Sequence, residues 1–195
     1  MTLKPLDVAD LAEAVLGCAC AALEATAVTV PGQPGCPDCR ACVVPGTAAW
    51  DTCDSPATST GAGGQLTVNV ARLYASTRDA FPVEVRAVQG LRGCLLPPLT
   101  AVELVITLLR CAPTADEQGV PPDCAALAAT AQTLHVDMAT LYNSLLCCLP
   151  GLDPSKRLGA LFVMGVSRTI GPEGGCVGVE QRVTVALPGC ACPTT

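Results

Sequence analysis

The sequence predicts an α/β (α+β) protein with a single domain, in which a mixed or antiparallel sheet of about five strands packs against two long helices. Three observations support this prediction. Two segments carry apolar residues at helical spacing, and five segments carry strand patterns. The chain has 195 residues, of which 50% are hydrophobic, and this length suffices to bury one core. We therefore expect residues 1–195 to form one structural domain.

The first helix is predicted near the N-terminus. Asp7 stands just before an apolar pattern that runs from Val8 to Leu23 with three- and four-residue spacing. Aspartate is a favoured N-cap residue because its side chain accepts a hydrogen bond from the first turn. We therefore expect Asp7 to cap an amphipathic helix.

The second helix is predicted between Pro121 and Pro150. Proline is tolerated in the first turn, and the carboxylate of Asp123 suits the positive end of a helix. The pair Pro150-Gly151 is a typical stop signal. An apolar stripe along one face is formed by Leu127, Ala131, Leu134, Met138, Leu141, Leu145 and Cys148.

Strands are predicted at five places. Gln65–Tyr74 and Val177–Leu187 alternate apolar and polar residues, which indicates strands with one buried face. Ala101–Arg110 is mostly apolar on both faces, which is typical of a central strand. The shorter candidates are Val83–Val88 and Leu158–Val166.

Between the first helix and the first of these strands lies a loop rich in Cys, Pro and Gly, at about residues 30–64. Loops of this length in a compact domain are usually functional or held in place. The segment has too few apolar residues to offset the conformational entropy lost on ordering it. We therefore expect its cysteines to hold it.

Cysteine is unusually frequent, with 14 in the chain. Cys36, Cys39, Cys42 and Cys53 have the ligand type and spacing that a tetrahedral zinc ion accepts. Two alternatives stand beside zinc: disulfides formed after release from the cell, and reduced thiols that fill gaps in the core. Neighbours such as Cys147-Cys148 are too close to pair easily with each other, so disulfides would join different elements. Of the two cross-linked forms we favour disulfides in the mature protein.

No residue pattern indicates catalysis. His135 is the only histidine, and Ser-His-Asp or Cys-His chemistry needs a base, a nucleophile and an orienting group. Asp137 lies two positions further along the same helix and would point off its other flank. The glycines of 61–64 precede a strand, whereas phosphate-binding loops follow a strand and open a helix. We expect no enzyme, no catalytic residue and no cofactor-binding residue.

The charge pattern argues against specific binding to nucleic acid. The formal net charge is −6, and the 11 basic residues are scattered, whereas affinity for phosphate depends on clustered Lys and Arg. DNA would be able to pass such a surface without being gripped. No uninterrupted apolar run reaches the about 18 residues of a membrane span, and the N-terminus lacks a basic region followed by an apolar core. We expect a soluble protein made in the cytoplasm.

The later part of the chain contains several distinctive runs. They are "GQLTVNVARLYAS", "ELVITLLRCAP", "LCCLPG" and "GPEGGCVGVEQRVTVALPGCACP", which lie within about residues 53–193. In these runs the chain resembles a family of head-to-tail connector proteins encoded by actinobacterial siphophages of the mycobacteriophage type. The most specific parts are Arg110–Pro113 and Gly171–Cys176. The order of elements is also similar to that of the tail terminators of lambda-type phages.

This resemblance implies a structural role. A tail terminator forms a ring, here expected to be a homohexamer, that caps the tail tube and joins it to the head connector. The implied partners are further copies of the chain, the tail tube protein and the head-to-tail stopper, and the implied location is the neck of the virion. The alternatives are a stopper, which is usually a β-barrel, or another neck protein. A small Cys-based metal or redox module is a further alternative, and the resemblance implies no catalytic residues.

Overall fold

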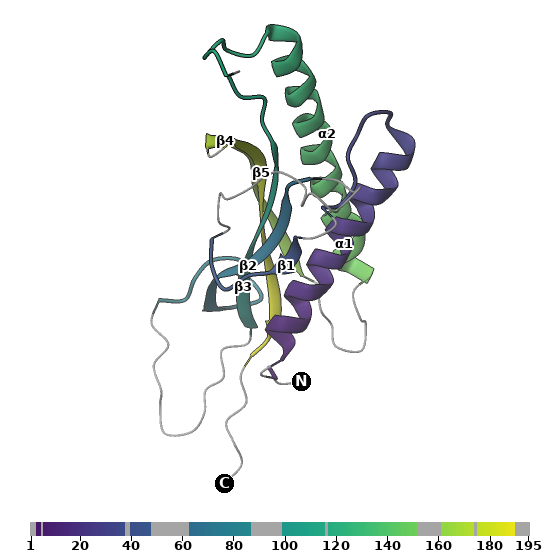
Figure 1. The fold of residues 1–195 in the computed structure, drawn as a ribbon. Helices are drawn as coiled ribbons and strands as arrows, with labels where there is room; N and C mark the ends of the chain where they lie inside the picture. The colour runs from purple at the N-terminus through teal and green to yellow at the C-terminus, as the bar shows by residue number, and fades with distance from the viewer. Residues whose placement is uncertain are drawn as a thin grey trace, which may run out of the picture.

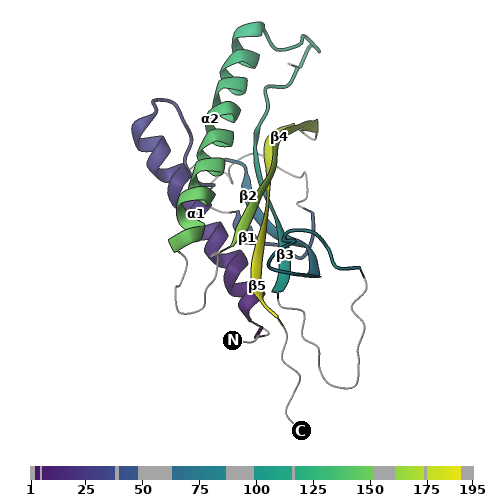
Figure 2. The same cartoon turned by 180° about the vertical axis from the view of Figure 1, so that it is seen from behind.

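The computed structural model describes residues 3–4, 6–37, 40–47, 63–86, 99–115, 117–151, 161–173 and 175–189. In this part of the chain two long helices lie on the same side of one five-stranded sheet, as the two opposite views show (Figure 1, Figure 2). The predicted α+β class is therefore confirmed, with a mixed sheet and two long helices.

Helix α1 spans Asp7–Thr29 and packs its apolar face on the sheet. The prediction that Asp7 is the N-cap is wrong, because the capping position is Leu6, which makes no side-chain cap. Asp7 lies instead inside the first turn, where its Oδ2 accepts a hydrogen bond from the backbone N–H of Lys4 at 2.8 Å. A carboxylate in the first turn still favours the helix through the helix dipole.

Helix α1 is also long and apolar enough to cross a membrane, judged by length and composition alone. The core helix of a soluble protein meets the same criterion. In this fold Leu11, Val15 and Leu23 of α1 have no exposed surface and belong to the core.

Helix α2 spans Cys124–Cys148 and is followed by a single 3-10 turn, η1, at Leu149–Gly151. Asp123 caps it, because its Oδ1 accepts a hydrogen bond from the N–H of Ala126 at 2.7 Å. The two prolines therefore precede the helix and do not form its first turn. Leu134, Leu141 and Leu145 are buried as the apolar stripe predicts, whereas Leu127 is 49% exposed.

The sheet has the strand order β1-β2-β3-β5-β4. Its strands are β1 (Ala41–Val43), β2 (Gln65–Ser76), β3 (Leu99–Cys111), β4 (Phe162–Glu173) and β5 (Cys176–Pro188). Only the β1–β2 pair is parallel, and the other three pairs are antiparallel. The central position predicted for residues 101–110 is confirmed in β3, which is buried on both faces along most of its length.

One predicted strand is replaced by another. Residues 83–86, the described part of the candidate Val83–Val88, form no strand. They fold back on the end of β2, where Ser76 Oγ donates to the carbonyl of Val83 at 2.8 Å. The fifth strand is β1, inside the segment that we expect to be a loop, and three residues are too few to show a period of two.

The core lies between the helices and one face of the sheet. Helix α1 packs over β1, β2 and β3, and α2 packs over β4 and β5. The sheet contributes Leu66, Val68, Val102, Leu104, Ile106, Leu108, Val179, Val183, Val185 and Leu187. Val70 is 36% exposed, and the β2–β3 register shifts directly after it, between Val70 and Arg72.

Gly64 fixes the entry into β2. Its φ is +97°, a conformation that side chains other than glycine rarely adopt. A Cβ at this position would also collide with the carbonyl oxygen of Leu109 on β3. The glycine run at 61–64 thus contains a residue that the strand pairing requires, whereas the sequence indicates only a flexible entry to the strand.

Candidate functional site

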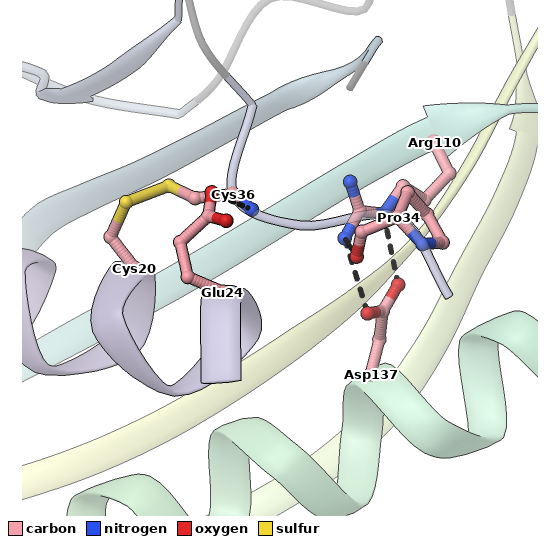
Figure 3. The surroundings of a disulfide bond; sticks show 6 residues. All are labelled: Cys20, Glu24, Pro34, Cys36, Arg110 and Asp137. Atoms are coloured by element: carbon pink, nitrogen blue, oxygen red, sulfur yellow. Dashed lines mark hydrogen bonds and ion pairs between the residues drawn. A yellow bond between two sulfur atoms is a disulfide. The ribbon is translucent and has the colours of Figure 1, made fainter. Parts of the chain in front are cut away.

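Of the four cysteines predicted to bind zinc or form disulfides, the structure describes Cys36 and Cys42. Cys36 is in a disulfide with Cys20 of α1, with 5.0 Å between their Cα atoms (Figure 3). Cys42 is an exposed free thiol on β1, and Cys39 and Cys53 lie outside the described residues. Among the described residues no three His, Cys, Asp or Glu side chains are grouped to hold a metal ion.

A second disulfide joins Cys18 of α1 to Cys148 at the end of α2, and its partners are 130 residues apart in sequence. Cys147, the neighbour of Cys148, is an exposed free thiol. The prediction that Cys147 and Cys148 would not pair with each other agrees with this arrangement. The two disulfides tie α1 both to α2 and to the segment that follows α1.

A buried ion pair joins β3 to α2. Arg110 Nε donates to Asp137 Oδ2 at 2.9 Å, and Nη2 donates to Oδ1 at 3.2 Å. Nη2 also donates to the carbonyl of Pro34 at 3.3 Å. The Arg110 side chain is 5% exposed and that of Asp137 is fully buried.

The segment after α1 completes this cluster. Gln33 Nε2 donates to Asp137 Oδ1 at 2.6 Å and to the carbonyl of Thr133 at 3.3 Å. Figure 3 shows the third guanidinium nitrogen, Nη1, directed away from Asp137, and this buried atom has no hydrogen-bond partner among the described residues. The arrangement neutralises both charges and connects three segments that are distant in sequence.

The face of the sheet that points away from the helices carries a network of ion pairs. Glu103 of β3 accepts from Arg72 of β2 at 2.8 Å and from Arg182 of β5 at 3.0 Å. Glu180 of β5 accepts from Arg182 at 3.0 Å and pairs with Arg168 of β4 at 3.1 Å. Arginines and glutamates thus alternate across four strands.

The network lowers the pKa of its carboxylates. Partial burial acts to raise the pKa of Glu103, but hydrogen bonds from Arg72 and Arg182 outweigh it, and the pKa lies below its ordinary value. At Glu180, too, partial burial acts to raise the pKa. Hydrogen bonds from Arg182 and Arg168 outweigh it, so the pKa is also lowered. The hydrogen bond to Glu103 raises the pKa of Arg72. The carboxylates of Glu103 and Glu180 are therefore charged near neutral pH, where the paired arginines offset them.

The outer side of the helix layer is hollowed. An open groove of about 870 Å³ lies between the C-terminal half of α1 and the outward side of α2. His135 lines it and is exposed, whereas Asp137, two positions on, is buried on the inner side. The two side chains therefore do not share a site, as their spacing predicts.

Sequence reasoning missed the buried cluster. Arg110 stands at the end of an apolar strand and Asp137 within an apolar helix, so each is a charged residue where the pattern expects a buried position. That conflict indicates buried charges that need partners. No spacing rule would have paired Arg110 with Asp137, because 27 residues separate them.

The described structure offers three features: a buried ion-pair cluster, a sheet face on which arginines pair with glutamates, and a groove between the helices lined by small side chains together with His135. No protein-family model matches the chain, and no curated protein matches it as a relative.

Proposed function

We propose that this chain is a structural protein of a phage virion, namely a tail terminator that forms a ring between the tail tube and the head connector. The proposal rests on the sequence resemblance described above together with the fold. A terminator is expected to place a mixed sheet against helices, and the described chain has two long helices on one face of a mixed sheet. This agreement is the observation that carries the proposal.

The form of the sheet favours a terminator over a stopper. Stoppers are expected to be β-barrels, and closing a barrel removes the sheet edges. Here the described strands form a sheet whose order ends at β1 on one side and at β4 on the other. An open sheet offers edges and sides that a neighbouring subunit is able to cover.

The charge distribution supports a role beside DNA without specific binding. On the sheet face that points away from the helices, a glutamate pairs with each of three arginines, Arg72, Arg168 and Arg182. Arginines that are already paired with carboxylates release few counterions on meeting phosphates, so they add little affinity for DNA. DNA would pass such a surface without being retained.

The test is to delete the gene from the phage that encodes it and to examine the lysate by electron microscopy. We expect filled heads without tails beside overlong or unattached tubes, and recovery of normal particles when the gene is supplied from a plasmid. Heads that leak DNA beside finished tails would assign the stopper function instead. Normal infectious particles from the deletion would contradict both neck functions.

A further inference from the structure

The segment that follows α1, residues 30–36, covers part of the buried ion pair. Its Gln33 donates to Asp137, and the carbonyl of its Pro34 accepts from Arg110. Gln33 is itself only 8% exposed. The same segment lines a cavity of about 480 Å³ that reaches Arg110. The segment therefore forms part of the cover that keeps water from the ion pair.

Apolar packing contributes little to holding this segment. Of residues 30–36, two are glycine and two are proline, and only Cys36 belongs to the hydrophobic core. The polar anchors include the bonds of Gln33 and Pro34 to the cluster, and one from the backbone N–H of Cys36 to the carboxylate of Glu24 at 2.9 Å. Because each ordered residue loses conformational entropy, a segment with so few buried side chains needs a further anchor.

The disulfide between Cys20 and Cys36 supplies that anchor (Figure 3). It joins the end of the segment to α1, which is held in place by its own packing on the sheet. Figure 3 shows the disulfide at Cys36 and the ion pair beside Pro34, two residues apart along the same stretch of chain. Oxidising surroundings allow such a bond, whereas reducing compartments keep thiols free. The hold on the segment thus depends on the redox state of the surroundings.

We propose that the Cys20–Cys36 disulfide is a redox-sensitive latch, which holds residues 30–36 over the Arg110–Asp137 pair when oxidised and releases them when reduced. Reduction breaks the Sγ–Sγ bond: a dithiol reductant supplies two electrons and two protons, becomes a disulfide itself, and leaves Cys20 and Cys36 as thiols. Cys20 is only partly buried, so the bond is not sealed inside the core. Release opens this side of the ion pair to water while the helices stay packed on the sheet. The inference does not depend on the proposed virion role.

Two double variants separate the latch from the other disulfide of α1. Cys20→Ser/Cys36→Ser, here called the latch variant, removes the bond and leaves neither thiol to pair elsewhere. Cys18→Ser/Cys148→Ser removes the link between the two helices and is the matched control. Circular dichroism of the full chain verifies that each variant is folded.

Hydrogen exchange, followed by mass spectrometry of peptides, measures the opening of residues 30–36. The backbone N–H groups of Gln33 and Cys36 donate to Val30 and Glu24, so their exchange requires the segment to open. The disulfide joins residues 16 apart in sequence, and closing a loop of that length favours the closed state on the order of 100-fold. We expect the segment to exchange about 100-fold faster in the latch variant and at about the wild-type rate in the control. The peptide of β3 should remain the slowest in every protein, because the opening is local.

Reduction and re-oxidation of the wild type test whether the latch is reversible. Dithiothreitol should raise the exchange of residues 30–36 to the rate of the latch variant, and oxidised glutathione should restore the slow rate. A latch variant that exchanges as slowly as oxidised wild type would overturn the inference, since the polar contacts would then hold the segment alone. An equal rise in the control, or loss of the whole fold in the latch variant, would also overturn it, because the effect would not be confined to this segment.

Discussion

At the residue scale, burial separates two kinds of ion pair in this protein. Arg110 and Asp137 are removed from water, and breaking such a pair leaves a buried charge that costs about 3–5 kcal/mol. The arginines on the sheet face that points away from the helices remain 42–58% exposed, and such pairs contribute little because water and salt screen them. The buried pair should therefore dominate the effect of charge substitutions on stability.

The first prediction concerns Arg110 and Asp137. Asp137→Leu should lower the free energy of unfolding by about 3–5 kcal/mol, because Arg110 is left buried without a counter-charge. The double variant Arg110→Met/Asp137→Leu should lose much less, since both charges are gone. Urea unfolding monitored by circular dichroism measures the difference, with Arg168→Met as the exposed control. If the single and double variants lost the same free energy of unfolding, the unpaired buried charge would not be the cause of the loss.

The second prediction concerns acid. The pKa values of Glu103 and Glu180 are lower in the folded chain than the ordinary value of 4.5. Their contribution to stability is therefore fully present above about pH 5 and is lost as the pH falls through the folded-state pKa values. Glu103→Gln should reduce the loss of stability between neutral pH and pH about 3.5, measured by thermal melts. The same pH dependence in wild type and variant would contradict this account of the network.

At the element scale, α2 shows how a uniform apolar stripe divides into two environments. The stripe runs from Leu127 to Cys148, but only its later part lies over the sheet. Leu134, Leu141 and Leu145 are therefore buried, while Leu127 near the start is exposed. The helical period is the same along the stripe, so the extent of the sheet beneath it decides which residues form core.

The third prediction compares two positions of this stripe. Leu141→Asp should unfold the domain, because an unpaired carboxylate in the core costs several kcal/mol of a total stability of about 5–15 kcal/mol. Leu127→Asp, at a position 49% exposed, should leave a cooperative thermal transition. A folded Leu141→Asp variant would show that α2 does not pack on the sheet as described.

At the scale of the whole molecule, the helix layer is linked covalently as well as by packing. Cys18–Cys148 connects the two helices, and Cys20–Cys36 connects α1 to the segment that supplies Gln33 and Pro34 to the buried cluster. The chain has only five aromatic residues, and aromatic side chains bury the most area per residue. Because the core has few aromatic side chains, we expect the disulfides to contribute a larger share of the free energy of unfolding.

The fourth prediction tests this share. Cys148→Ser should lower the free energy of unfolding by about 2–4 kcal/mol, because the lost link closes a long loop in the unfolded chain. Cys147→Ser removes the neighbouring free thiol and is the matched control. Urea unfolding with and without a reductant measures both, and reduction should bring wild type to the level of Cys148→Ser or below. A Cys147→Ser variant as unstable as Cys148→Ser would disprove the pairing.

The sequence by itself determined the elements whose patterns are long and local. The periods of α1, α2, β2, β3 and β5 follow from the side chains that each element must bury, so the fold class was predictable. Short elements were not: β1 has three residues, and the described part of the candidate at 83–88 is held by the side chain of Ser76 at the end of β2. A period of two needs several residues to be visible and does not say whether a partner strand is near.

Only the tertiary structure decided which distant groups meet. Arg110 with Asp137, and Cys18 with Cys148, are pairs that the chain brings together across 27 and 130 residues. Their partners depend on the path of the sheet and on the packing of the helices over it, and no local spacing encodes that path. The same holds for the groove, because residues of α1 and α2 line it together only after the two helices have packed side by side.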